Sequence, residues 1–239
     1  MRPNLLTALA LALTLATSSC NLTSSAPISA LLAVHAEPET GICNPLAPLG
    51  ALAAARGWRF IVDASLTCGA YPIDMGAFAI DALATASGFS LESAAGLGIL
   101  ALSGRRIPAF PPPLPDDSES PPVPLLLALE QALIELEQEG GVAGRAARYR
   151  DNHQTLIRGM AALGFEPLAG NGSRSYLTAR FRPPAGCRPE RDLTESLRQR
   201  GFLISPGPLV ATMGRIYPAT IESFLSALRD VLAASHAAA

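Results

Sequence analysis

Residues 30–64, ALLAVHAEPETGICNPLAPLGALAAARGWRFIVDA, predict the fold of this chain. The apolar run ALLAVHAE is typical of a buried parallel strand, and RFIVDA predicts a second one with Asp63 near its end. Between them, NPLAPLGALAAARG predicts a helix with Asn44 as its N-cap, Pro45 in the first turn and Gly57 at its C-terminal stop. A strand, a helix and a strand of these lengths indicate an α/β fold, with a mostly parallel sheet covered by helices.

The rest of the chain continues this pattern in two parts. DALATA and GLGILAL are two further strand candidates, and eight prolines within residues 105–124 then prevent a helix or a central strand. Helices are next predicted over LLLALEQALIELEQEGG and residues 144–163, followed by the strand SYLTARFRP, the helix ERDLTESLRQRG, the strand FLISPG and the helix ATIESFLSALRDVLAAS. We therefore expect an apolar leader or helix at 1–27, a large α/β domain at 28–104, a Pro-rich linker at 105–124, and a helical connection with a small α+β domain at 125–239.

The N-terminal residues 1–20, MRPNLLTALALALTLATSSC, allow two interpretations. One arginine, a twelve-residue apolar stretch and small residues before Cys20 imitate a secretory or lipoprotein leader. Thr17, however, stands where a lipoprotein signal usually has an aliphatic residue, and the run from Leu5 to Ala16 is too short to span a bilayer as a helix. The second interpretation is an apolar helix that leads into the first strand. We expect a cytoplasmic protein, with an exported or lipoprotein form as the alternative.

Composition argues against two classes of function. The net charge is −2 and the arginines are scattered, which is unlike a nucleic-acid-binding surface. The densest basic run, GRAARYRDNHQTLIR (144–158), is predicted to be the solvated face of a helix. The four cysteines form no CxxC pair and no His lies at metal spacing, so a zinc site is not expected. Hydrophobic residues make up 49% of the chain and charged residues only 16%, which favours a buried interface or a hydrophobic leader.

The absence of lysine has a chemical consequence. All 18 basic side chains are arginine. A Schiff base needs a nucleophilic primary amine, and a guanidinium group stays protonated and cannot supply one. The amine of the N-terminus is therefore the only one available in the chain.

Several motifs together resemble a known family. The stretch from Ala33 to Leu83, AVHAEPETGICNPLAPLGALAAARGWRFIVDASLTCGAYPIDMGAFAIDAL, is similar to the class V aminotransferases of fold type I. ALEQALIELEQEGGVAGRAARYRDNHQTLIRGMAALGFEPL, LRQRGFLISPGPL and GRIYPATIESFLSAL resemble the C-terminal domain of that family. The resemblance runs in order over residues 28–235, and its motifs look most like those of 2-aminoethylphosphonate:pyruvate transaminases. It implies that residues 28–104 are the remnant of a cofactor-binding large domain.

The resemblance implies a site for pyridoxal phosphate, from which important groups are lost. Asp63 occupies the place of the acid that pairs with the protonated pyridine nitrogen. Over the family motif SSANKxxxGxPG the chain reads Thr85 to Phe89, with Gly96 closing the motif, so Phe89 stands at the lysine position. Covalent binding of the cofactor is therefore not expected. No catalytic residue is therefore predicted. Asp63 has an alternative interpretation, as an ordinary acidic residue at the end of a strand.

Three further departures from the family point the same way. Pro38 stands where the family has a Ser or Thr that bonds to the cofactor, and Arg215 follows rather than precedes the glycine of the substrate-binding motif. The family's N-terminal third, which supplies the phosphate-binding glycines, has no counterpart here. Ser120, in SPPVP, resembles the Thr of TPPTH that reaches the phosphate of a neighbouring subunit, although Ser-Pro-Pro is also common in Pro-rich linkers.

These observations leave several hypotheses about function. The first is a truncated, non-catalytic homologue of a pyridoxal-phosphate-dependent transaminase, for which the name aminotransferase would describe ancestry. The second is an interaction or regulatory protein that pairs as a homodimer, or as a heterodimer with an intact paralogue. An exported lipoprotein-like product is a third, and it depends on residues 1–20 alone.

Overall fold

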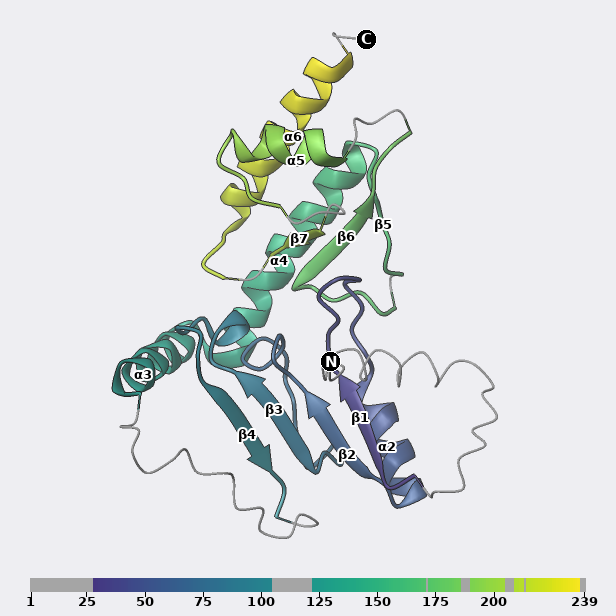
Figure 1. The fold of residues 1–239 in the computed structure, drawn as a ribbon, viewed down its shortest axis with the longest axis vertical. Coiled ribbons are helices and arrows are strands. Elements are labelled where there is room, and N and C mark those ends of the chain that lie inside the picture. Colours follow the sequence, from purple (N-terminus) through teal and green to yellow (C-terminus); the bar gives the residue numbers. More distant parts are fainter. Residues whose placement is uncertain are drawn as a thin grey trace, which may run out of the picture. The chain divides into compact units, whose positions relative to one another are not determined.

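The computed structural model describes residues 28–104, 122–170, 172–185, 190–204, 209–212 and 214–236 (Figure 1). The described chain forms two compact units. The first contains residues 28–35, Asn44–Cys68 and Pro72–Leu133, and the second contains Ala36–Cys43, Gly69–Tyr71 and the chain from Ile134 onward. The predicted leader or helix at 1–27 and most of the Pro-rich linker lie outside the described residues.

The first unit is built on a four-stranded sheet in the order β1-β2-β3-β4. Its strands are β1 (Ala30–Val34), β2 (Arg59–Asp63), β3 (Ala82–Ala86) and β4 (Gly98–Leu102). The first three run parallel, with Val34 in register with Asp63 and Asp63 with Ala84, and β4 is antiparallel to β3. All four predicted strands are therefore confirmed, and so is the mostly parallel character of the sheet.

Helix α2 (Leu46–Arg56) connects β1 to β2 and covers one face of the sheet. As predicted, it ends at Gly57, whose φ of 68° lies in the left-handed region that glycine adopts without strain. The predicted N-cap is wrong. Pro45 holds the cap position without a side-chain bond, and Asn44 Nδ2 instead donates to Val34 O of β1 at 2.8 Å. Asn44 thus fixes the strand that precedes the helix.

The two faces of this sheet differ in burial. The face under α2 is formed by residues of the first core, including Ala33, Phe60, Val62 and Leu83. The opposite face carries side chains from the alternate positions, which are half-buried or exposed: Leu32, Val34, Ile61, Asp63, Ala84, Leu100 and Leu102. Parallel sheets are usually covered on both faces. We call the second face the open face. Its exposure of apolar side chains is unusual for a mostly parallel sheet.

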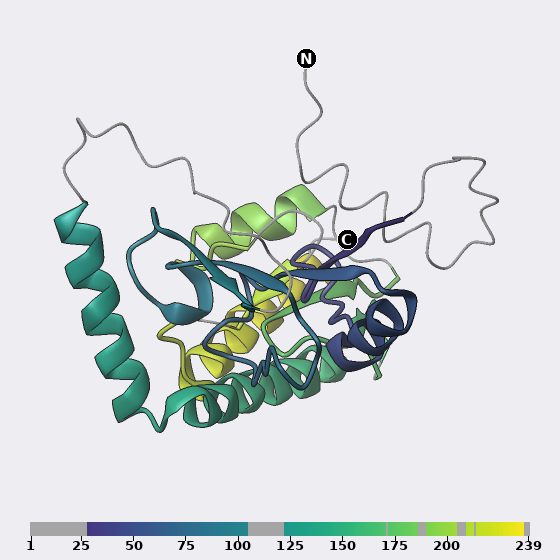
Figure 2. The same cartoon turned by 90° about the horizontal axis from the view of Figure 1, so that it is seen from below.

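Helix α3 (Val123–Gln138) adds a second exposed apolar surface. Within the first unit its exposed large side chains are Val123, Leu126, Leu127 and Leu133. Its Leu125 lies on the other side, where its Cδ1 would contact a Cβ added at Gly96. The apolar side chains of a helix usually face a core, so this exposed apolar set is unusual. Figure 2 shows α3 as one continuous helix.

The second unit combines three helices with a three-stranded antiparallel sheet. Its elements are α4 (Gly141–Ala162), β5 (Glu166–Pro167), β6 (Thr178–Arg182), α5 (Glu190–Arg198), β7 (Leu209–Ala211) and α6 (Pro218–His236), with the sheet order β5-β6-β7. Its core lies between α4, α5, α6 and the sheet, where residues such as Leu156, Phe181 and Leu228 are almost fully buried.

Two sequence predictions in this unit are wrong. FLISPG was expected to be a strand, but 202–204 are irregular and the strand is Leu209–Ala211. Phe202 N donates to Leu197 O at 3.0 Å, so Phe202 completes the end of α5 and its ring packs on the core. The basic run on α4 is not simply a solvated face either. Arg145 is 1% exposed, and its Nε donates to Glu139 Oε2 at 2.8 Å.

None of the helices in the described parts of the chain combines the length and the apolar composition needed to cross a membrane.

Candidate functional site

The candidate site lies in the first unit, where β1, β2 and β3 end. In open parallel sheets, ligands bind outside the carboxyl ends of the strands. Here β1 leads to His35, β2 ends at Asp63, and β3 leads to Ser87. The polar side chains that follow these strands therefore lie at one edge of the sheet, with the loop of Thr67 beside them.

Asp63 is the last residue of β2, and its side chain is on the open face. It is half-buried, and its Oδ1 accepts a hydrogen bond from Ser65 N at 2.9 Å. This bond fixes one carboxylate oxygen. A carboxylate at this place can pair with a protonated ring nitrogen or another small cation, which is the role that the sequence predicts for Asp63.

His35 and Thr67 form a second polar group at the same edge. His35 Nδ1 and Thr67 Oγ1 are 2.9 Å apart and share a hydrogen bond, and His35 N donates to Asp63 O at 2.9 Å. Both side chains are buried. Burial lowers the pKa of His35 from 6.5 to about 4, because it disfavours the charged imidazolium. His35 is therefore neutral at pH 7 and does not act as a cation.

The loop after β3 contains the position predicted to replace the family lysine. Ser87 Oγ donates to Ala94 O at 2.7 Å and accepts from Leu97 N at 3.2 Å, which ties the two ends of the loop together. Between them, Phe89 begins a short 3₁₀ helix, η1 (Phe89–Leu91), with a φ of 41°. This left-handed conformation is uncommon for a bulky residue. The phenyl ring is 55% exposed, so it packs into no core.

The remaining groups at this edge offer little covalent chemistry. Thr85 Oγ1 donates to Ala64 O at 3.3 Å, and Cys68 lies close enough to bond with Thr85. Burial raises the pKa of the Cys68 thiol, so the reactive thiolate is disfavoured. Among the described residues, no three His, Cys, Asp or Glu side chains gather in a way that could hold a metal ion.

The structure brings together some predicted site residues and adds others. Asp63 and Phe89 both belong to the first unit, whereas Ser120 lies outside the described residues. His35 and Thr67 were not predicted. Their one sequence signal is that His35 directly follows an apolar strand and Thr67 closely follows another, the arrangement that places side chains at a carboxyl edge.

The stability of the first unit is expected to fall as the pH drops from about 6.5 to about 4. In this range the unfolded His35 takes up a proton while the buried one does not, so protonation favours the unfolded state. The free energy of unfolding should fall by about 3 kcal/mol. Urea unfolding followed by Trp58 fluorescence measures it, and His35→Gln should reduce the dependence on pH.

His153→Gln is the matched control for this prediction. His153 is a buried histidine of the second unit whose pKa is also lowered to about 4, by burial and by Arg174. Its replacement should leave the transition reported by Trp58 as dependent on pH as in the natural chain. If stability depends on pH equally in the natural chain and in His35→Gln, protonation of His35 is not the cause of the loss of stability.

Comparison with known proteins identifies the family of this chain. The sequence model of the family Aminotransferase class-V matches residues 14–221. The 2-aminoethylphosphonate–pyruvate transaminase of Aeromonas hydrophila is 34% identical over 229 residues, which are 84% of this chain and 60% of the relative. The corresponding transaminase 2 of Polaromonas sp. is 34% identical over 236 residues, which are 88% of this chain and 63% of the relative.

Solved structures show the same fold. Pyridoxamine-pyruvate aminotransferase from Mesorhizobium loti matches with a TM-score of 0.77 at 23% identity, over 87% of this chain and 61% of that one. Alanine–glyoxylate aminotransferase from Nostoc sp. matches with a TM-score of 0.73 at 22% identity, over 85% and 62%. The chain spans about three-fifths of the length of the curated relatives. By its sequence and its mixed α/β fold with a mostly parallel sheet, the chain belongs to the class V aminotransferase family.

Proposed function

We propose that this chain is a non-catalytic member of its family, which does not capture pyridoxal phosphate covalently and does not transaminate by itself. The observation that carries the proposal is Phe89. It stands where the family motif has its lysine, and the chain has no lysine elsewhere. A phenyl ring cannot form the covalent link to the aldehyde, and arginine cannot replace the amine.

The residues at the candidate site fit only part of the cofactor. When bound, pyridoxal phosphate supplies an electron sink. Asp63, fixed by Ser65 N–H, suits its protonated ring nitrogen, and His35 is neutral and hydrogen-bonded beside it. The position that needs an amine carries Phe89. Removing one member of a catalytic group can abolish most of its effect, so retention of Asp63 does not restore the activity.

Pyridoxal phosphate titration tests this proposal on the natural protein. Absorbance is followed during the titration, the mixture is reduced with borohydride, and the mass of the intact protein and its peptides is measured. We expect no added mass on an internal residue. A stoichiometric adduct at one internal position would overturn the proposal, whereas an adduct at Met1 reports only the one available amine.

A second function, association with another class V subunit, is favoured by the open face of the first unit. Leu100 is 62% exposed on β4 at the edge of the sheet, and Leu127 is 59% exposed on α3. Exposed large apolar side chains favour association, and so does an uncovered sheet edge. We infer that the chain pairs through this surface, with a second copy or with an intact paralogue.

Replacing Leu100 and Leu127 together by Glu is expected to shift the chain from dimer to monomer in light scattering after size-exclusion chromatography. Two charges in an apolar interface are costly to desolvate, so the dissociation constant should rise at least about 100-fold. Leu52→Glu is the control, because Leu52 is 42% exposed on α2, away from the open face. An unchanged molar mass in the double variant would exclude this surface.

A further inference from the structure

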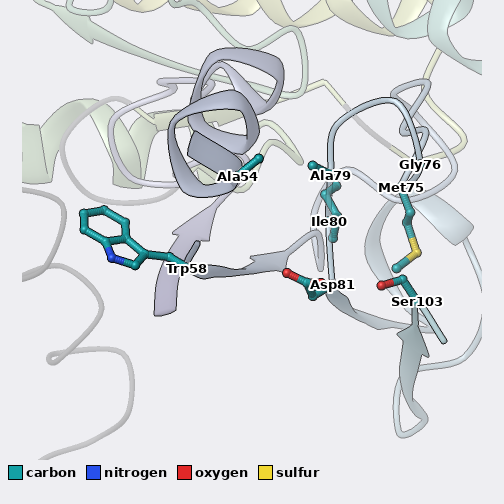
Figure 3. Close-up of a pocket in the computed structure, with 8 residues that line it drawn as sticks. All are labelled: Ala54, Trp58, Met75, Gly76, Ala79, Ile80, Asp81 and Ser103. Carbon is teal, nitrogen blue, oxygen red and sulfur yellow. The ribbon is translucent and has the colours of Figure 1, made fainter. Parts of the chain in front are cut away.

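A cavity of about 160 Å³ lies at the end of the sheet opposite to the candidate site. It is next to the amino ends of β2 and β3 and the carboxyl end of the antiparallel β4 (Figure 3). All of its lining residues belong to the first unit: Ala54, Trp58, Met75, Gly76, Ala79, Ile80, Asp81 and Ser103. Among the residues that line it, the side chains with oxygen atoms are Asp81 and Ser103.

Asp81 is held rigidly at the wall of this cavity. Its Oδ2 accepts a hydrogen bond from Phe60 N at 2.8 Å, its own N donates to Phe60 O at 2.8 Å, and its O accepts from Ser103 N at 2.9 Å. These three bonds use the backbones of the strands on both sides. They fix a carboxylate that is only 7% exposed at the wall of the cavity that Ser103 also lines.

This buried carboxylate has no cationic partner within the described ranges of the chain. The salt bridges found there all involve other acids. Arg56 is nearby, but its guanidinium lies over the Trp58 ring, 5.4 Å from the ring centre. Arg105 and Arg106 follow Ser103 closely in sequence and lie outside the described residues. A buried charge is costly unless it is paired, so Asp81 is suited to a cation from outside.

The walls determine which kind of cation fits. Apart from Asp81 and Ser103, the cavity is lined by the side chains of Ala54, Ile80, Met75 and Trp58, which are largely apolar. A bare metal ion of the hard class prefers about six oxygen ligands, more than these side chains offer. An engineered cavity of about 150 Å³ holds benzene, so this volume suits a ligand of about six heavy atoms.

We propose that this cavity binds a small primary alkylammonium ion, with its ammonium group on the Asp81 carboxylate and the Ser103 hydroxyl. The alkyl chain then contacts Met75 and Ile80. The ammonium group can donate three hydrogen bonds, and the apolar wall favours a short hydrocarbon over water. This site lies at the opposite end of the strands from Asp63 and does not depend on the proposed function.

Trp58 provides a direct readout, because it is the only tryptophan of the chain and lines the cavity. The natural protein is titrated at pH 7 with n-butylammonium chloride and, separately, with n-butanol, which has the same chain and no charge. We expect a saturable change in Trp58 emission, with a dissociation constant at least about tenfold lower for the ammonium ion. Equal affinities for the two ligands would overturn the proposal.

Two variants and a control separate binding from folding. Asp81→Asn keeps an acceptor for Phe60 N and should weaken n-butylammonium binding at least tenfold. Ala54→Leu keeps the charge but fills the cavity, and it should abolish binding of both ligands. Asp74→Asn removes a carboxylate of the same loop that does not line the cavity, and it should leave the affinity unchanged.

The proposal remains testable if Asp81→Asn does not fold. The comparison of the ammonium ion with the alcohol uses the natural chain alone, and Ala54→Leu leaves Asp81 in place. Undiminished binding in a folded Asp81→Asn or Ala54→Leu variant would place the ligand elsewhere and overturn the proposal. The absence of any change in Trp58 emission would also overturn the proposal. That result is expected if a cationic side chain of the protein already pairs with the Asp81 carboxylate.

Discussion

The Phe89→Lys variant is expected to gain a borohydride-stable pyridoxal phosphate adduct at position 89 that the natural chain lacks. The natural side chain at this position is 55% exposed and belongs to no core, so the replacement removes little packing. Its φ of 41° is unchanged by exchanging one side chain with a Cβ for another. The variant contains a single lysine, so mass analysis of peptides locates the adduct without ambiguity.

Arg59→Lys is the matched control for this gain of reactivity. It also introduces one lysine into a chain without any, but at the first residue of β2, which is exposed and at the opposite end of the strand from Asp63. At equal pyridoxal phosphate concentration, labelling at position 89 should exceed labelling at position 59 at least about tenfold, because Asp63 pairs with the ring nitrogen. Equal labelling would mean that position 89 has no special place in the site.

Adding Asp63→Asn to Phe89→Lys tests the role of the acid separately. A neutral amide cannot stabilise the positive charge of the protonated ring nitrogen. The extent of pyridoxal phosphate labelling at position 89 should therefore decrease towards the extent seen at position 59 in Arg59→Lys. The bond that Ser65 N donates to Asp63 Oδ1 can be kept by the amide oxygen, which makes this change mild for the fold. An unchanged preference would make Asp63 an ordinary strand-end acid.

The first unit could be predicted well because its elements are specified locally. β2 and α2 are a short apolar run and a helix ended by Gly57, and both appear within a few residues of their predicted limits. The prediction of Asn44 as the N-cap of α2 was wrong because its side chain can also form a hydrogen bond with a backbone group outside the helix. The alternative to capping the helix, a bond to Val34 O, is a tertiary contact that no local pattern shows.

The less predictable features depend on which side chains are buried. Arg145 was placed on a solvated face because charged residues usually are, yet Glu139 pairs with it and makes its burial tolerable. The environment of His35 could not be predicted, because its bond to Thr67 joins residues 32 positions apart. Asp63 was proposed as a site residue because a resemblance named it. Its position at a strand end alone would have indicated only a polar edge.

Gly50→Ala is expected to destabilise the first unit severely. A Cβ at Gly50 would lie 1.8 Å from the carbonyl oxygen of Phe78, far inside any real contact distance. Gly50 is buried in the middle of α2, and Phe78 belongs to the loop that packs against the helix. On helix propensity alone, exchanging glycine for alanine would stabilise the chain by about 1 kcal/mol. The clash and the propensity therefore act in opposite directions.

The clash should dominate because the carbonyl cannot move away cheaply. Phe78 N donates to Asp74 O at 3.0 Å, and Ile80 N donates to Met75 O at 2.8 Å, so the loop is fixed on both sides of Phe78. Separating helix and loop would expose Phe60, whose side chain lies between them, 3.3 Å from the added Cβ.

We expect a loss of about 3 kcal/mol in the free energy of unfolding, at the upper end of the usual cost of overpacking. Urea unfolding followed by Trp58 fluorescence measures it. Gly98→Ala is the control, because a Cβ there meets nothing within 4 Å and its φ is ordinary. A stability of Gly50→Ala equal to that of the control would mean that α2 does not approach the loop this closely. The position of α2 against the loop of Phe78 would then be incorrect. The shape of the cavity beside Asp81, which the same loop lines, would be incorrect as well.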